Sequence, residues 1–350
     1  AYGRNLGVSE LRLQLQLQLR LRRLRLGRLA MQEAKIKFRG RSEFRYQPKR
    51  VCIPVGMACN VKCTYCMRDA GKIREPREVS PDMRRFLAQL DPATTEAVIA
   101  NGGEPLLYLD RIKEIFSLVQ PEIHRAVMTN GTLMTDGIAD WLNGMDGELH
   151  FSHEGTASKE LKGVDVLEDE KILRALNRVK TMRVYTIVTA KNPDVLKSYE
   201  YIAEKLHRVK HLWFTPFPMF AFGGQDPSLT ENFDYDTFAR STVELWQKHP
   251  EAVGRNAHHR HYVRNTGHVI LPDASVASLV TLLRYGTVFE SKEAIMARAK
   301  AMGEYDYCLK QDCPAREHCS MAMQIANPFT CEALRTYLAA LDYMRTFNVL

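Results

Sequence analysis

Short runs of apolar and β-branched residues alternate with amphipathic stretches from Arg50 onward. Short apolar runs bounded by turn residues predict buried strands, and apolar positions repeating every three or four residues predict helices. Six strands are expected, at 51–55, 97–101, 124–129, 148–152, 183–189 and 211–215. Helices are expected between them, at about 81–91, 108–119, 133–143, 167–180 and 194–206. This alternation predicts an α/β fold made of βα units around a mainly parallel sheet.

Two of the expected helices begin at clear sequence signals. Ser80 followed by Pro81 combines a capping residue with a proline in the first turn, and Asn192-Pro193-Asp194 is similar. Six βα units are too few for the eight-stranded closed barrel. We therefore expect a partial (β/α)6 TIM-type barrel.

The pattern changes on both sides of this region. Residues 11–29 alternate Leu with Arg or Gln, which is a strand period in a low-complexity sequence. Beyond about residue 250, a hairpin-like segment at 262–272 precedes a Cys-rich region, for which we expect a small α+β domain. The expected segments are an extension outside the fold (1–30), a lead-in (31–48), the core (49–250) and an auxiliary domain (251–350).

Charge is concentrated in the first 50 residues. They carry 14 Lys and Arg against 3 Asp and Glu, so the rest of the chain is net negative although the whole has a formal charge of +8. An anionic-surface or nucleic-acid arm, or an organelle transit segment, has this composition. We favour an extension that precedes a native start at Met31. No uncharged apolar run approaches the roughly 20 residues that a spanning helix needs, so no membrane role is expected.

Eight cysteines in a chain without a signal-peptide pattern favour metal ligation in a reducing cytoplasm over disulfides. Cys59, Cys63 and Cys66 lie within eight residues, directly after the first expected strand. The carboxyl ends of barrel strands are where ligands bind. Three thiolates without a fourth nearby suit a cubane cluster that leaves one iron open, whereas a structural zinc site needs a fourth ligand.

Two motifs resemble those of a known family. The C-x-x-x-C-x-x-C loop, with Tyr65 before its last cysteine, resembles the signature of the radical S-adenosylmethionine (SAM) superfamily. The segment after the second strand resembles that family's glycine-rich SAM-binding motif, in which glycines let the backbone approach a ligand closely. The resemblance implies a [4Fe–4S] cluster on the three cysteines with SAM at the open iron. It also implies SAM contacts from Gly102, Gly103, Glu104 and Pro105, with the Glu104 carboxylate accepting from the methionyl amino group.

Later strand ends extend the resemblance. Thr129-Asn130-Gly131 ends the third strand as in many relatives, and Ser152 begins a segment similar to the family's Ser-x-Asp-Gly, with Glu154 in place of Asp. Lys162 stands where relatives have Arg, so it would meet the SAM carboxylate as a point charge. The resemblance implies that Asn130, Ser152 and Lys162 contact SAM. The alternatives are an ordinary Asn-Gly turn and a solvated surface lysine.

A second cysteine group provides a complete ligand set for a closed cluster or for zinc, namely Cys308, Cys313, Cys319 and Cys331. After a radical SAM core, it resembles the SPASM/twitch extension of peptide-modifying maturases and anaerobic sulfatase-maturating enzymes. Pro272 and Met323 stand where ligands of another cluster would lie, so the resemblance implies one auxiliary [4Fe–4S] cluster. Asp273 occupies the place of a proton-accepting Asp, with a surface turn as the alternative.

The resemblance implies an oxidoreductase or maturase that cleaves SAM reductively to a 5′-deoxyadenosyl radical, which abstracts hydrogen from the substrate. The first substrate hypothesis is a peptide or protein, oxidised, crosslinked or epimerised as by a ribosomal-peptide maturase. The alternative is dehydrogenation or rearrangement of a small molecule, such as an aminocyclitol or nucleotide. A third hypothesis is a zinc-stapled nucleic-acid-binding protein. Expected partners are SAM, the substrate and an electron donor such as flavodoxin or ferredoxin, without nucleic acid.

Overall fold

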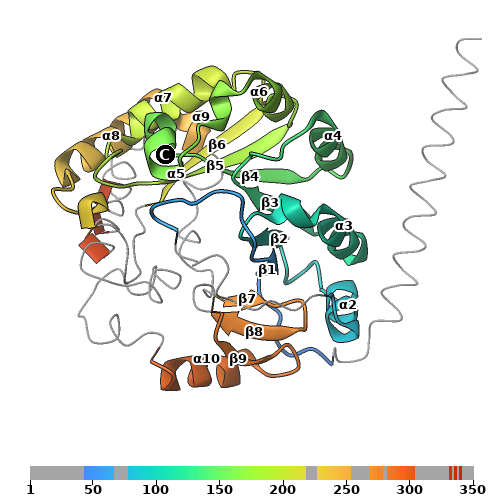
Figure 1. Cartoon of the computed structure of the whole chain (residues 1–350). Coiled ribbons are helices and arrows are strands. Elements are labelled where there is room, and N and C mark those ends of the chain that lie inside the picture. The colour runs from blue at the N-terminus through green and yellow to red at the C-terminus, as the bar shows by residue number, and fades with distance from the viewer. Residues whose placement is uncertain are drawn as a thin grey trace, which may run out of the picture. The chain divides into compact units, whose positions relative to one another are not determined.

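A computed structural model describes residues 43–66, 78–217, 227–253, 268–278 and 282–303, with 331–332, 335–336 and 339–340. Strands and helices alternate along most of this length (Figure 1). In chain order they are β1 (Arg50–Gly56), α2 (Pro81–Ala88), β2 (Ala97–Gly102), α3 (Leu109–Leu118), β3 (His124–Thr129), α4 (Asp136–Gly144), β4 (Glu148–Ser152), α5 (Ser158–Lys162), α6 (Glu170–Leu176), β5 (Thr181–Ile187), α7 (Val195–Lys205), β6 (His211–Phe217), α8 (Tyr235–Lys248) and α9 (Pro250–Val253). All six expected strands are confirmed, each within two residues at both ends.

The six strands form one sheet in the order of the chain, from β1 to β6. Every neighbouring pair is parallel. This confirms the expected parallel α/β architecture of partial-barrel type. Because all carboxyl ends of parallel strands lie at one edge, the loops after β1 to β4 meet there.

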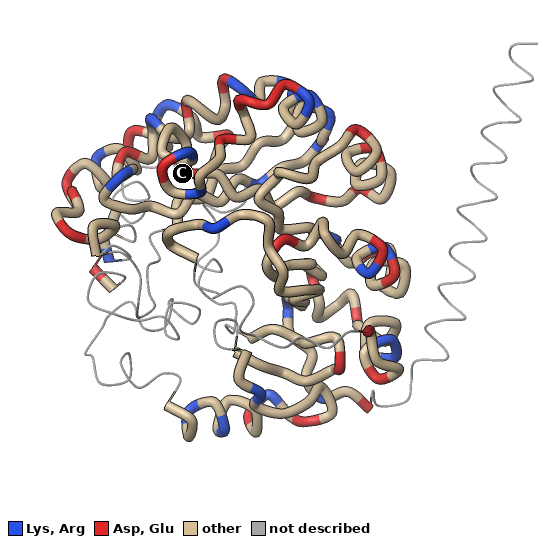
Figure 2. The backbone as a smooth tube through the Cα atoms, viewed as in Figure 1, with Lys and Arg blue, Asp and Glu red and all other residues tan. Residues whose placement is uncertain are grey.

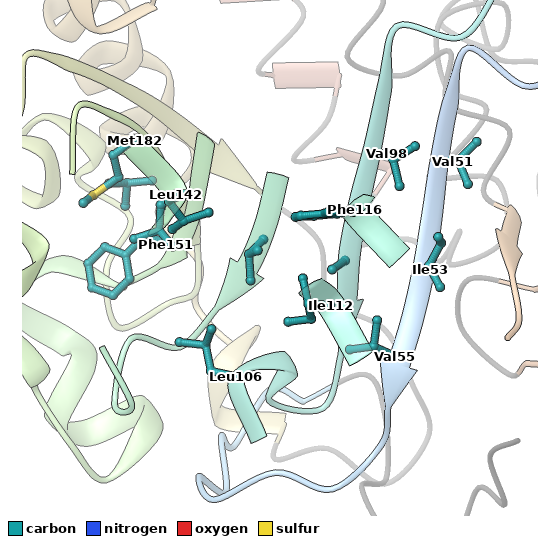
Figure 3. Packing of buried hydrophobic residues seen from close by; sticks show 14 of the residues in the cluster. Val51, Ile53, Val55, Val98, Leu106, Ile112, Phe116, Leu142, Phe151 and Met182 are labelled. Atoms are coloured by element: carbon teal, nitrogen blue, oxygen red, sulfur yellow. The ribbon is translucent and has the colours of Figure 1, made fainter. Parts of the chain in front are cut away.

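Side chains on the two faces of the sheet pack against different neighbours. Val51, Ile53 and Val55 of β1 lie on the helical side, where they join a core with Ile112 and Phe116 of α3 (Figure 3). Residues at the alternating positions face the other way. A second apolar cluster on that inner face contains Cys52, Ala97, Ile99, Ala126, Val269, Leu271 and Ala277.

Part of the inner cluster comes from a small antiparallel sheet. Its strands are β7 (His268–Ile270), β8 (Ser275–Ser278) and β9 (Arg284–Thr287), and α10 (Lys292–Ala301) follows it. The hairpin turn lies after Ile270, so the described hairpin covers 268–278, while residues 262–267 of the expected segment lie outside the described residues. The reason is local. Asp273 accepts a hydrogen bond from the Ser275 amide (3.0 Å), and Ala274 has a φ of 66°, a left-handed turn conformation.

The expected helix starts are confirmed at two positions. The Ser80 hydroxyl accepts from the Met83 amide (3.1 Å) at the start of α2, with Pro81 in the first turn. The Asp194 carboxylate accepts from the Lys197 amide (2.9 Å) at the start of α7. Such caps each stabilise a helix by about 1 kcal/mol.

Charged residues lie mainly on the helices, where Lys and Arg are interspersed with Asp and Glu (Figure 2). Within the described ranges, no helix combines the length and apolar character required to cross a bilayer. The charge pattern on this part of the chain is that of a mixed surface without one dominant sign.

Acidification is expected to destabilise the protein through His268. Its imidazole lies 3.0 Å from the Tyr46 hydroxyl, and burial, with a contribution from Lys292, lowers its pKa from 6.5 to about 4. Between these values the unfolded chain binds a proton that the folded chain does not, so stability falls as the pH drops through this window. We expect a loss of about 2 kcal/mol at pH 5 relative to pH 7.

Urea unfolding at both pH values measures this loss. The His268→Gln variant should lack this part of the pH dependence, because it removes the titrating group. A variant as sensitive to pH as the wild type would contradict the assignment to His268.

Candidate functional site

The three cysteines of the first group follow β1 on a loop tied to α5. Thr64 donates to the Leu161 carbonyl through both its amide (2.9 Å) and its hydroxyl (3.2 Å). Cys59 and Cys63 are half-buried, and Cys66 is exposed. In the described part of the chain, no three His, Cys, Asp or Glu side chains surround a single metal ion. Each cysteine of a cubane cluster binds a different iron, so three cysteines on one loop suit such a cluster.

The glycine-rich loop after β2 packs backbone to backbone against the start of the cysteine loop. The Gly103 amide donates to the Gly56 carbonyl (2.9 Å), and the Glu104 amide donates to the Ala58 carbonyl (2.8 Å). A Cβ atom at Gly103 would lie 2.3 Å from the Ala58 oxygen. Glycine is therefore needed for this close approach, as the motif predicted.

Replacing Gly103 by alanine is expected to displace the cysteine loop, because the Ala58 carbonyl that the new Cβ would meet is held by the Glu104 amide. Overpacking of this kind costs about 1–3 kcal/mol, so we expect roughly tenfold weaker SAM binding and reduced iron content. Equilibrium binding of SAM and iron analysis measure both. Gly144→Ala is the matched control, since nothing lies within 4 Å of its added Cβ. Equal SAM affinity in the two variants would contradict the prediction.

Glu104 is fully buried and joins this loop to the end of β3. Its Oε1 accepts from the Leu106 amide (2.9 Å) and the Thr129 hydroxyl (2.7 Å), while its Oε2 accepts from the Asn130 amide (2.8 Å). Burial raises the pKa of this carboxyl, and the three donors oppose that effect. The carboxylate is engaged by the protein itself, so its expected contact with the SAM amino group stays a prediction.

Asn130 lies at the end of β3 with its side chain directed toward the cysteine loop. Its Nδ2 is 3.8 Å from the Cys59 sulfur and 3.1 Å from Asn60 Oδ1. The structure thus brings the predicted residue to the cluster cysteines, and its contact with SAM stays a prediction. Pro105 is buried and begins a short 3-10 helix, Pro105–Tyr108.

Lys162, Ser152 and Glu154 form a buried network at the end of β4. Lys162 Nζ lies 3.0 Å from Glu154 Oε2 and donates to the carbonyl (2.5 Å) and hydroxyl (3.0 Å) of Ser152. Because Lys162 is only 6% exposed, the alternative of a solvated surface lysine is wrong. The structure brings together Lys162 and Ser152, which were both predicted to contact SAM, and those contacts with SAM stay predictions.

Tyr65 connects this network to the cysteine loop. Its hydroxyl donates to Glu154 Oε1 (2.5 Å). Burial, reinforced by the charge of Glu154, raises the pKa of the phenol, so it keeps its proton and acts as a donor. Burial also raises the pKa of the neighbouring Cys63 thiol to about 11. The cysteine loop is therefore fixed from the β2 side by glycine packing and from the β4 side by a hydrogen bond.

A second polar group, on the inner face of the sheet, was missed by the sequence analysis. Glu148 Oε1 accepts from Arg183 Nε (2.9 Å) and lies 3.0 Å from His150 Nε2, while its Oε2 lies 3.0 Å from His124 Nε2. Although burial opposes ionisation, His150 and the other partners hold the pKa of Glu148 well below its usual range. The sequence pattern that could have predicted this group is the polar residue at every second position of β4, at 148, 150 and 152.

Two buried acceptors of the sheet have no hydrogen-bond partner among the described residues, namely Asn101 Oδ1 on β2 and His150 Nδ1 on β4. Burial lowers the pKa of His150, so the ring is neutral and its Nε2–H donates to Glu148. The Nδ1 lone pair is then an acceptor. Strand alternation places Asn101 on the same face as Ile99, and His150 on the same face as its β3 neighbour Met128. A donor group of a ligand or a water would satisfy each of these atoms.

The remaining predicted residues lie apart from this site or outside the described ranges. Asp273 Oδ2 pairs with Arg284 Nη2 (2.6 Å), and its Oδ1 holds the β7–β8 turn, so its contacts are those of a turn residue. Its role as a proton acceptor stays a prediction. Cys331 is half-buried in a helix. Cys308, Cys313 and Cys319 lie outside the described residues.

Residues 53–190 match the family model described as the Radical SAM superfamily. This part of the chain is a radical SAM domain. Its cofactors are a [4Fe–4S] cluster and SAM, as predicted. The match covers β1 to β5, with the cysteine loop, the glycine-rich loop and the Ser152–Lys162 network.

Two curated relatives of the radical SAM domain come from different enzyme classes. A cysteine-type anaerobic sulfatase-maturating enzyme of Clostridium perfringens is 26% identical over 226 residues, which cover 55% of this chain and 58% of that enzyme. A GTP 3′,8-cyclase of Vibrio parahaemolyticus is 36% identical over 89 residues, covering 24% of this chain and 27% of the cyclase. The chain thus spans little more than half of the first relative and about a quarter of the second.

Solved structures share the fold over most of the chain. The structure of anSMEcpe with bound AdoMet and Kp18Cys peptide has a TM-score of 0.62 at 19% identity, covering 86% of this chain and 99% of that one. Streptococcus suis SuiB bound to S-adenosylmethionine has a TM-score of 0.54 at 15% identity, covering 84% of this chain and 74% of that one. The likeness to these structures shows a shared fold, and the family-model match confirms the predicted resemblance to the radical SAM superfamily.

Proposed function

We propose that this chain is a radical SAM oxidoreductase or maturase that holds its cluster on Cys59, Cys63 and Cys66. The observation that carries the proposal is that hydrogen bonds link the loops after β1, β2 and β4. The cysteine loop after β1 is hydrogen-bonded to the glycine-rich loop after β2, and Tyr65 bonds to Glu154 after β4. Together the cluster and SAM supply reductive cleavage of a carbon–sulfur bond and hydrogen abstraction from a substrate.

The protein's own residues bind and orient SAM in this proposal. The backbone at Gly102 and Gly103 packs closely beside the cysteine loop, where glycine lets a ligand approach the main chain. Lys162 and Ser152 hold a positive charge and a hydroxyl where a carboxylate would bind. Glu154 and Tyr65 fix Lys162 and the loop in one arrangement, which favours a single orientation of the cofactor.

We infer a peptide or protein substrate, which would be oxidised, crosslinked or epimerised. The match to a sulfatase-maturating enzyme, and the shared fold with anSMEcpe and SuiB, support this substrate class. The buried acceptors at Asn101 and His150 suit a substrate that offers N–H or O–H donors. A small nucleotide-like substrate is the second candidate, supported by the 36% identity to a GTP 3′,8-cyclase.

We also infer one auxiliary [4Fe–4S] cluster on the second cysteine group, supported by its complete set of four thiols, Cys308, Cys313, Cys319 and Cys331. Such a cluster has no open iron for substrate. Its role would be to accept an electron or to brace the C-terminal region. A flavodoxin or ferredoxin would supply electrons to the first cluster.

The decisive experiment measures 5′-deoxyadenosine formed from SAM by anaerobically reconstituted protein with dithionite. A cysteine-containing peptide and GTP are tested in parallel, with mass spectrometry of each. Deoxyadenosine formation that the peptide stimulates, together with a mass change in the peptide, is the expected result. Stimulation by GTP but not by the peptide would show that the substrate is nucleotide-like rather than a peptide. The absence of SAM cleavage under any condition would overturn the proposed function.

A further inference from the structure

We propose that Asn130 sets the reduction potential of the cluster by donating a hydrogen bond to the sulfur of Cys59. The inference rests on the proposed function, in which Cys59 is a cluster ligand. Asn130 Nδ2 lies 3.8 Å from Cys59 Sγ, within hydrogen-bond range for sulfur. It is thus a positioning residue that acts through the cysteine.

The orientation of the Asn130 amide follows from its other contacts. Its Oδ1 accepts from the Thr132 backbone amide (2.9 Å) and from the Thr132 hydroxyl (2.6 Å). A backbone N–H can only donate, so the atom facing Thr132 is the oxygen and the NH₂ group faces the cysteine loop. One of its hydrogens meets Asn60 Oδ1 (3.1 Å), which leaves the other for the sulfur.

Asn130 is held in place from two sides. Its backbone amide donates to the buried Glu104 carboxylate (2.8 Å), and Asn60 Nδ2 donates in turn to the Thr132 hydroxyl (2.8 Å). The Gly131 amide bonds to the Thr129 hydroxyl (3.0 Å), which closes the turn after β3. The donor is therefore presented to Cys59 by a fixed loop rather than by a freely rotating side chain.

The physical effect of this donor depends on the charge of the cluster. Reduction adds negative charge that spreads onto the cysteine sulfurs, so an N–H donor stabilises the reduced form more than the oxidised form. Hydrogen bonds to the sulfurs are among the factors that set cluster potentials. Asn130 should therefore make the cluster easier to reduce.

The test is a potentiometric titration of the reduced-cluster EPR signal in reconstituted wild type and Asn130→Ala, with and without SAM. We expect a roughly tenfold smaller ratio of reduced to oxidised cluster at a fixed potential in the variant, a shift of about 59 mV to more negative values for a one-electron couple. Iron content is measured in parallel, because it reports cluster assembly separately. Thr132→Val is the matched control, since it keeps the Asn130 amide and the Thr132 backbone donor, and its potential should change far less.

A second measurement does not depend on the variant folding. Wild type labelled with ¹⁵N in asparagine side chains should show a hyperfine coupling from that nitrogen in the reduced cluster, absent in unlabelled wild type. Equal potentials in wild type and Asn130→Ala at equal iron content, or no asparagine coupling in the wild type, would overturn the inference. Wild type that binds no iron would instead refute the proposed function.

Discussion

Replacing Cys59, Cys63 and Cys66 together by alanine is expected to lower the iron content from about eight to about four per chain, because each [4Fe–4S] cluster contributes four irons. SAM cleavage should be abolished. The fold should persist, since the three side chains lie on a loop and are at least partly exposed. Iron and sulfide analysis with EPR of anaerobically reconstituted protein measures the change, and SAM should perturb only the wild-type signal.

Cys52→Ala provides the control for this variant. Cys52 lies outside the three-cysteine loop and is buried on β1 within the inner apolar cluster. It should keep the full iron content. Full iron in the triple variant would contradict the assignment of the cluster. A fall from about four irons to none would show that the second cysteine group holds zinc or no metal.

Removing the charge of Lys162 is expected to have the largest effect on stability of any single substitution in this network. The side chains of Lys162 and Glu154 are 4% and 0% exposed and lie 3.0 Å apart, so Lys162→Met leaves a buried carboxylate without its cation. Breaking a buried pair in this way costs about 3–5 kcal/mol. Because Lys162 also donates to Ser152, SAM binding should weaken as well.

A double-mutant cycle separates the two effects. Lys162→Met with Glu154→Gln should recover much of the lost free energy of unfolding, measured in urea, without recovering SAM affinity. Lys191→Met is the surface control, because its pair with Glu160 (3.1 Å) is 38% and 59% exposed and contributes about 0–1 kcal/mol. Additive effects of the Lys162 and Glu154 substitutions would contradict a direct coupling between them.

The strands and the strand-end loops could be predicted from the sequence because their signals are local. Runs such as Val51–Val55 are apolar on both faces, which is typical of a buried parallel strand. The cysteine spacing and the paired glycines also lie within single short segments. A feature that depends on one segment can be predicted from the sequence of that segment alone.

Features that depend on contacts between segments could not be predicted. The sequence left a surface position for Lys162 as an alternative, because its burial depends on the ion pair with Glu154 on another segment. Glu104 was expected to face SAM, and its engagement with Thr129 and Asn130 depends on the pairing of β2 with β3. The contacts between His124, Glu148 and Arg183 likewise require three neighbouring strands to be in register.

The backbone contact between Gly103 and residues 57–58 limits how this site can be transplanted. A designer who grafts the cysteine loop onto another parallel barrel would have to carry the glycine-rich loop with it, because the Ala58 carbonyl bonds to the Glu104 amide and tolerates no side chain at Gly103. The two loops form one cassette, although a strand and a helix separate them in the chain. Neither loop alone is a portable module.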